Sequence, residues 1–159
     1  MSGKLYICPT PIGNLEDMTY RTIRILNEVD LIAAEDTRHS IKLLNHFEIS
    51  KPLTSYHEHN KDSKGGYLIN KLLEGENIAL ISDAGMPGIS DPGEEVIKQA
   101  IENNIEIEVL PGATASITAL VGSGLETAKL AFEGFLDRDK KRRREFPKDR
   151  DDEDLIFGD

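Results

Sequence analysis

Residues 82–93 restrict the fold of this chain more than any other stretch, because they read SDAGMPGISDPG directly after the apolar run at 78–81. The run predicts a short strand, and the three glycines and two prolines that follow predict a shaped loop. Asp91 is placed to cap a helix that begins at Pro92, and apolar residues then recur with helical spacing. Strand, loop and helix in this order are typical of an α/β protein, where such loops bind ligands. A plain connection is the alternative, but the loop is longer than most of its kind.

The same order recurs along the chain. Further strands are predicted by short apolar runs at 5–8, 30–34, 52–57, 105–110 and 130–136. Between them, apolar residues three and four apart predict helices. Two more loops follow strands: residues 9–17, stiffened by two prolines, and residues 111–116, which are rich in small side chains. The alternation predicts an α/β fold with a mostly parallel sheet flanked by helices, and three loops at one edge of it.

Two local features each allow two interpretations. Residues 64–66 read KGG and predict a flexible joint before a helix that ends at Gly75. His57 and His59 would share one face of an extended strand, as metal ligands can. No third ligand at a recognised spacing accompanies them, so a solvent-facing or substrate-facing role is favoured and no metal is predicted.

Charge is distributed unevenly. The net charge is −10, yet residues 1–137 hold 11 Lys and Arg against 21 Asp and Glu, whereas residues 138–159 hold 8 of each. The acidic main part argues against broad binding of nucleic acid, because phosphate binding needs clustered cations. A local basic run at 140–144 reads KKRRR and could contact nucleic acid, although a solvated face is the usual explanation.

The single cysteine and the apolar runs bear on localisation. Cys8 lies in an apolar run, which predicts a buried small side chain and excludes an intramolecular disulfide. No apolar run is long enough to cross a bilayer, and no signal peptide is recognised. These features predict a cytoplasmic protein that has no membrane partner.

Four motifs, taken in order, closely resemble a known family. They read TPIGNL at 10–15, EDTR at 35–38, SDAGMPGISDPG at 82–93 and PGATA at 111–115. The family is that of the bacterial small-subunit (16S) ribosomal RNA ribose 2′-O-methyltransferases I, in the tetrapyrrole-methylase-like superfamily. The resemblance covers residues 5–136. It implies two α/β domains with S-adenosylmethionine in the cleft between them, a homodimer, and methyl transfer to the 2′-hydroxyl of a cytidine in small-subunit ribosomal RNA.

The resemblance also implies where the cofactor binds. Carried over residue by residue, the cofactor-binding residues are Pro11, Asp83, Ala84, Gly85, Ile89, Thr114 and Ala115. Small residues admit adenosine to backbone groups, and amides at a helix start suit a carboxylate. The catalytic candidates are Glu35, Asp36 and Arg38, which follow a predicted strand. A helix cap with a solvated ion pair is the alternative for these three.

Members of the family are longer than this chain. The resemblance therefore implies an N-terminal methylase domain at 1–112 and the beginning of a truncated second domain, with a charged tail, at 113–159. Two other functions stay open. One is a related methylase that acts on a tetrapyrrole or another small molecule, and the other is an inactive, dimerising fragment.

Overall fold

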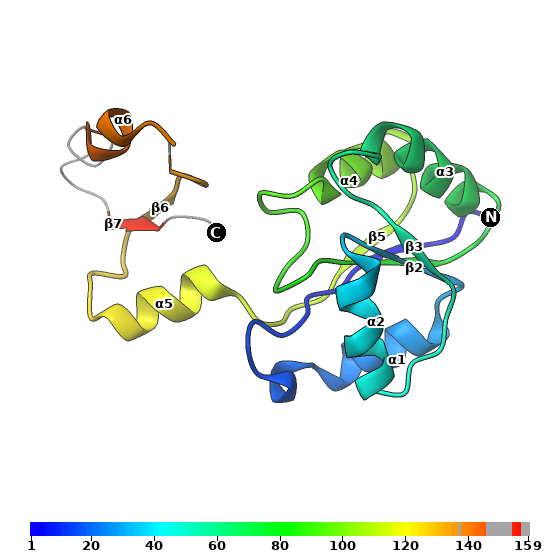
Figure 1. The fold of residues 1–159 in the computed structure, drawn as a ribbon. Helices are drawn as coiled ribbons and strands as arrows, with labels where there is room; N and C mark the ends of the chain where they lie inside the picture. The colour runs from blue at the N-terminus through cyan, green and yellow to red at the C-terminus, as the bar shows by residue number, and fades with distance from the viewer. Residues whose placement is uncertain (137, 146–153, 157–159) are drawn as a thin grey trace. The chain divides into compact units, whose positions relative to one another are not determined.

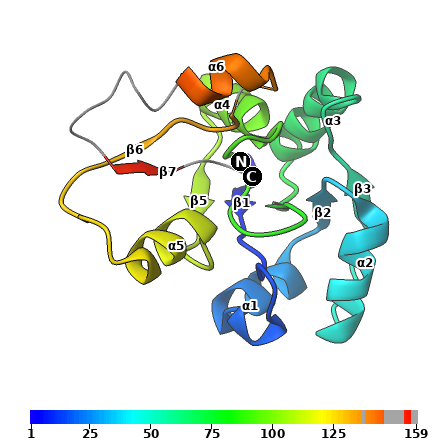
Figure 2. The same cartoon turned by 60° about the vertical axis from the view of Figure 1, so that its left-hand side comes forward.

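The computed structural model describes residues 1–136, 138–145 and 154–156 (Figures 1 and 2). Contacts divide the chain into two compact units, Met1–Ala113 and Thr114–Asp159. The predicted domain boundary, between residues 112 and 113, lies one residue before this division.

The first unit is built on a five-stranded sheet in the order β3-β2-β4-β1-β5, and every pairing is parallel. The strands are β1 (Leu5–Ile7), β2 (Leu31–Ala34), β3 (Leu53–Ser55), β4 (Ile78–Ile81) and β5 (Ile107–Val109). β4 lies between β1 and β2, although it follows both of them in the sequence. The predicted parallel α/β sheet is confirmed.

Helices cover both faces of this sheet, as Figure 1 shows. They are α1 (Tyr20–Glu28), α2 (Thr37–His46), α3 (Lys61–Leu73) and α4 (Gly93–Glu102), while the short 3₁₀ helix η1 (Leu15–Asp17) buries no residue. Leu26 of α1 and Leu44 of α2 are buried in one core cluster, while Leu68 of α3 and Val96 of α4 are buried in the other. β2 and β4 are buried at every residue because helices cover both of their faces.

The location of the site follows from the face of the sheet to which the chain turns after each strand. α1 follows β1 on one face of the sheet, and α4 follows the neighbouring strand β4 on the other. α2, which follows β2 on the far side of β4, lies on the same face as α1. Adjacent strands whose connections leave to opposite faces open a crevice at the carboxyl edge of the sheet, where ligands bind in such folds.

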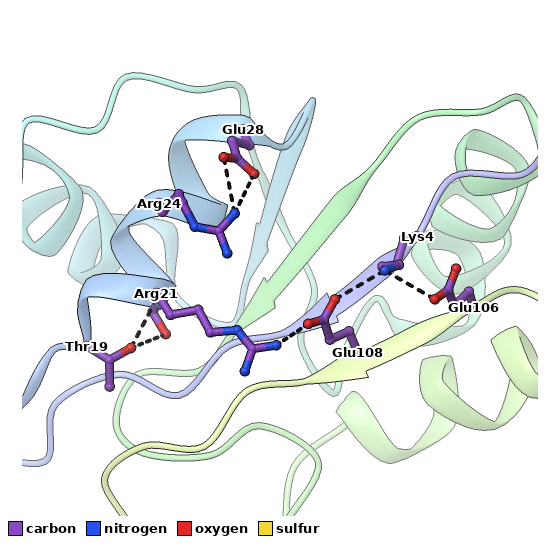
Figure 3. A network of polar contacts seen from close by, with 8 residues as sticks. Lys4, Thr19, Arg21, Arg24, Glu28, Glu106 and Glu108 are labelled. Carbon is purple, nitrogen blue, oxygen red and sulfur yellow. Dashed lines mark hydrogen bonds and ion pairs between the residues drawn. The ribbon is translucent and has the colours of Figure 1, made fainter.

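Charged side chains form a network of ion pairs along the outer strand β5 (Figure 3). Glu108 lies between Lys4 and Arg21, and the Lys4 Nζ is 3.2 Å from carboxylate oxygens of both Glu106 and Glu108. The hydrogen bond from Lys4, and then that from Arg21, lowers the pKa of Glu108. Charged side chains along an edge strand discourage pairing with another chain.

Gly65 and Gly66 lie inside α3, so the predicted flexible joint at 64–66 is wrong. Gly65 is buried against α4, where a Cβ on it would lie 2.9 Å from Oε1 of Gln99. The glycine lets the two helices approach closely, a tertiary cause that overrides its low helix propensity.

We expect Gly66→Ala to raise the free energy of unfolding by about 0.5–1 kcal/mol, because a Cβ there meets nothing within 4 Å and alanine favours the helix. Gly65→Ala is the matched control on the same helix and should fail to stabilise, since the Gln99 side chain must move. Urea unfolding followed by circular dichroism measures both. Equal effects of the two substitutions would contradict the packing account.

The second unit contains α5 (Ala115–Ser123), β6 (Leu130–Phe132), α6 (Lys140–Glu145) and β7 (Asp154–Ile156). β6 and β7 pair in parallel. β6 is shorter than the predicted strand at 130–136, and Gly134 beyond it turns the backbone with a φ of 75°. The remainder of the charged tail, 146–153 and 157–159, lies outside the described residues. Among the described helices, none is both long and apolar enough to cross a membrane.

Candidate functional site at the carboxyl edge of the sheet

A two-way backbone bridge joins the loops that follow β1 and β4. The amide of Thr10 donates to the carbonyl of Gly85, and the amide of Gly85 donates back to Thr10, both at 3.0 Å. The buried Thr10 hydroxyl also donates to the carbonyl of Ser82 at 3.2 Å. Gly85 has a φ of 75°, which glycine adopts without strain, so the bridge depends on its residue type.

The loop after β5 packs on the first loop. A Cβ on Gly112 would lie 2.3 Å from Cγ of Pro9, so the backbone rests directly on the proline ring. The first two predicted loops and the start of the third, residues 111–113, therefore come together within the first unit, whereas residues 114–116 of the third loop belong to the second unit.

Asp91 organises the central loop from inside. Its carboxylate accepts hydrogen bonds from the amides of Gly88 at 2.9 Å and Gly93 at 2.8 Å. α4 begins at Gly93, one residue later than predicted, and Asp91 binds the first amide of the helix. The buried Tyr56, which follows β3, donates its hydroxyl to the carbonyl of Pro92 at 2.9 Å and fixes the same turn from the other side.

Asp36 is the N-cap of α2, so the helix-cap interpretation of this motif holds. Its carboxylate accepts from the amide of Arg38 at 3.0 Å and lies 3.4 Å from the Arg38 guanidinium, which lowers the pKa of Asp36. The amide of Asp36 donates to Oδ1 of Asp83 at 3.2 Å, and Nε2 of His39 lies 3.1 Å from the carbonyl oxygen of Asp83. The loop after β2 is thereby joined to the loop after β4.

Negative charge is concentrated around Glu35. Its carboxyl group is half-buried, and its pKa is raised first by burial and then by the charges of Asp83, Asp91 and Asp36. Glu35 shares a cavity of about 10 Å³ with Tyr56, an opening with room for at most about one water. Four carboxylates gathered at one edge favour a ligand that carries positive charge.

The structure places the sequence-predicted cofactor residues as follows. Asp83, Ala84, Gly85 and Ile89 lie in the loop after β4, and Pro11 lies in the loop after β1. Ala84 and Ile89 are exposed, while Gly85 is buried in the bridge. In the second unit, Thr114 is the N-cap of α5 and makes no side-chain cap hydrogen bond, and Ala115 is the first residue of that helix.

Three side chains that hold this edge together were missing from the sequence-based site: Tyr56, His39 and Ser82. The partners of Tyr56 and His39 lie on other loops, so no local signal identifies these two. The Ser82 hydroxyl instead donates to carbonyls of its own loop, those of Ala84 at 3.2 Å and Gly85 at 3.1 Å. An open hollow of about 340 Å³ lies beside the loop after β4, lined by Glu58, Lys61, Ser90, Asp91, Pro92, Glu94 and Glu95. Among the described residues, no group of three or more His, Cys, Asp or Glu side chains is arranged to hold a metal, and the bend at His57 and His59 follows the end of β3.

The family of tetrapyrrole (corrin/porphyrin) methylases matches residues 4–156. This chain belongs to that family. The methylase chain is 59% identical over 143 residues to the "Ribosomal RNA small subunit methyltransferase I" of Halalkalibacterium halodurans, which covers 90% of this chain and 50% of that protein. It is 50% identical over 159 residues to the protein of the same name from Haemophilus influenzae, covering 99% and 56%. The resemblance drawn from the four motifs is confirmed, and the methylase chain spans about half the length of these relatives.

Solved structures agree on the fold. The uroporphyrin-III-C-methyltransferase of Thermus thermophilus superposes with a TM-score of 0.62 at 22% identity, covering 87% of this chain and 62% of that one. A putative cobalamin synthesis related protein from Corynebacterium diphtheriae gives a TM-score of 0.66 at 17% identity, covering 99% and 72%. At these identities the likeness concerns the architecture of the methylase family alone.

Proposed function

We propose that this chain forms the cofactor-binding part of an S-adenosylmethionine-dependent methyltransferase, which methylates the 2′-hydroxyl of a cytidine in small-subunit ribosomal RNA. One observation carries the proposal. Three glycine-containing and proline-containing loops meet at the carboxyl edge of a methylase-family sheet, around the carboxylates of Glu35, Asp36, Asp83 and Asp91. The names of relatives at 50–59% identity support small-subunit ribosomal RNA as the substrate, and the cytidine 2′-hydroxyl is part of the proposal.

The residues present fit the methyl donor. S-adenosylmethionine carries its methyl group on a cationic sulfur, and the carboxylates near Asp83 favour a cation there. The side chains of Ala84 and Ile89 are exposed. They leave room for the adenosine and offer it an apolar contact. We assign Pro11 and Gly85 to the same ligand through their loops, and Thr114 and Ala115 through the first amides of α5, which suit the methionine carboxylate.

Methyl transfer needs alignment of the acceptor and removal of its proton. Glu35 suits the second task, because its raised pKa brings the carboxylate closer to the pH at which a base must accept a proton. Asp36 orients the start of α2, and its neighbour Arg38 is exposed and able to bind a phosphate of the substrate in bidentate fashion. Glu35, Asp36 and Arg38 are therefore our proposed residues on the acceptor side.

We further infer a homodimer in the bacterial cytoplasm, where ribosomal RNA is made. The single cysteine is buried and free, as suits a reducing compartment. The second unit exposes large apolar side chains, which favour association with another chain: Ile117, Val121, Leu125, Leu130, Phe132, Phe135 and Leu136.

Calorimetric titration with S-adenosylhomocysteine tests the cofactor site. We expect Asp83→Ala to weaken binding about tenfold or more, which is about 1.4 kcal/mol. Asp83→Asn keeps an oxygen acceptor for the amide of Asp36 while it removes the charge, so the two variants separate loop geometry from electrostatics. Glu102→Gln, on an exposed residue of α4, is the matched control and should bind as the parent does.

Transfer of a labelled methyl group then identifies the acceptor. Label in small-subunit ribosomal RNA, and none in a tetrapyrrole offered at the same concentration, supports the proposal. The opposite preference would move the chain to the small-molecule methylases. Binding of S-adenosylhomocysteine without any transfer would identify a non-catalytic fragment, and unchanged affinity in both Asp83 variants would refute the assigned site.

A further inference from the structure

The α6 helix concentrates the positive charge of the chain. The helix has the sequence KKRRRE, so five of its six residues, Lys140 to Arg144, are cations. All five side chains are exposed. Residues three and four apart are neighbours on a helix, so Lys140 lies beside Arg143 and Arg144, and Lys141 lies beside Arg144. Like charges at these spacings repel one another and weaken the helix.

The start of the helix is held in spite of this repulsion. Asp139 caps it, because its Oδ1 accepts from the amides of Lys141 and Arg142, both at 3.0 Å, and its carbonyl accepts from the amide of Arg143 at 2.9 Å. The capping carboxylate also suits the positive end of the helix dipole. The cations are thus presented on an ordered turn.

Four of these cations have no carboxylate partner among the residues that the structure describes. Within the described part of the chain, Lys140, Lys141, Arg143 and Arg144 form no ion pair, whereas cations of the first unit such as Lys4 and Arg21 do. In a protein with 29 acidic residues, adjacent unpaired cations mark a surface for an external polyanion.

We propose that α6 is the RNA-docking element of this chain, with Lys140, Lys141, Arg143 and Arg144 binding phosphates of the substrate RNA. The inference rests on the proposed function and names the surface that holds the RNA. Arginine pairs with phosphate in bidentate fashion and lysine acts as a point charge, so the run combines two modes of phosphate binding. The acidic first unit repels RNA, so a cationic element orients the substrate as well as retaining it.

RNA fits this surface better than a lipid bilayer does. α6 contains no apolar side chain, so it has no face to bury in the membrane interface, as amphipathic surface helices do. Contacts to phosphate alone position a nucleic acid without reading its sequence. Phosphate contacts through α6 would therefore hold the RNA without selecting a nucleotide.

Fluorescence anisotropy of a labelled small-subunit ribosomal RNA fragment, titrated at several salt concentrations, tests the proposal. The double variants Lys140→Gln with Lys141→Gln, and Arg143→Gln with Arg144→Gln, should each weaken binding about tenfold near 0.1 M salt. Each pair should also reduce the slope of log affinity against log salt by about 1.4, since each phosphate contact on a single strand contributes about 0.7. Glutamine keeps a good helix propensity.

The matched control removes the same charge elsewhere, as Lys42→Gln with Lys98→Gln on exposed positions of α2 and α4. The proposal is overturned if the control weakens RNA binding as much as the α6 pairs do, if the parent chain does not bind the RNA, or if only vesicles with anionic lipid bind through α6. Affinity for S-adenosylhomocysteine, measured on the same variants, separates the two ideas. A parent chain that does not bind S-adenosylhomocysteine would refute the cofactor site. A salt-dependent loss of RNA binding in the α6 variants would still support docking by α6.

Discussion

Gly112→Ala is expected to lower the free energy of unfolding by about 3 kcal/mol, at the upper end of what overpacking costs. The added Cβ would lie 2.3 Å from Cγ and 2.9 Å from Cβ of Pro9. A proline ring cannot rotate away, so the loop after β5 or the loop after β1 must move. Urea unfolding of the purified chain measures the change.

A double-mutant cycle identifies the cause of this loss. Pro9→Ala removes the Cγ atom, which lies nearest to the new methyl group, but keeps the Cβ atom at 2.9 Å, so Gly112→Ala should cost less in that background without becoming neutral. Gly122→Ala, on α5 where a Cβ meets nothing within 4 Å, controls for the loss of glycine itself. A Gly112→Ala variant as stable as the parent would mean that the loops do not pack as described.

Alkaline pH is expected to destabilise the fold through two buried acids. Burial raises the pKa of the Cys8 thiol from 9.0 to about 12 and that of the Tyr56 hydroxyl from 10.0 to about 12. Below pH 9 both groups are protonated in the folded and unfolded chain, so neither makes stability depend on pH. Above it the unfolded chain loses its protons first, and the free energy of unfolding falls. At pH 12 the loss reaches about 4 kcal/mol for Cys8 and about 2 kcal/mol for Tyr56.

The two contributions begin at different pH values, which allows them to be separated. Between pH 9 and 10 the decline comes from Cys8, so Cys8→Ala should flatten that part of the curve. Tyr56→Phe should flatten the part above pH 10, and Tyr20→Phe, on a tyrosine that is 94% exposed, should leave it unchanged. Urea unfolding at a series of pH values gives these curves. Identical pH dependence in the parent and both buried-site variants would contradict the assignment.

The strands of the first unit were predictable from the sequence, and the reason is physical. β2 and β4 are covered by helices on both faces, so each is a continuous apolar run that a polar loop ends. The start of α2 was likewise present in the sequence as a possible cap at Asp36. Gly65 was misinterpreted, because its role depends on how α3 packs against α4, and adjacent residues do not record that contact.

The sequence predicted which loops form the candidate site, but it did not predict the contacts between them. Composition identified the loops after β1, β4 and β5, and the resemblance to a family assigned roles within them. The bonds that hold this edge together, from Thr10 to Gly85 and from Tyr56 to Pro92, connect segments that follow different strands. They depend on the strand order β3-β2-β4-β1-β5, which apolar periodicity alone does not specify.

The place of β4 in that order has a consequence for folding on the ribosome. β1 and β2 emerge first but are not neighbours in the sheet, because each pairs with β4, at residues Ile78–Ile81. A nascent chain that ends before this strand has β1 without a partner, and only β2 with β3 can pair. The central pairings must therefore wait until β4 has left the exit tunnel, and they then form together. Non-local pairing of this kind slows folding and makes completion of the sheet a late, cooperative step.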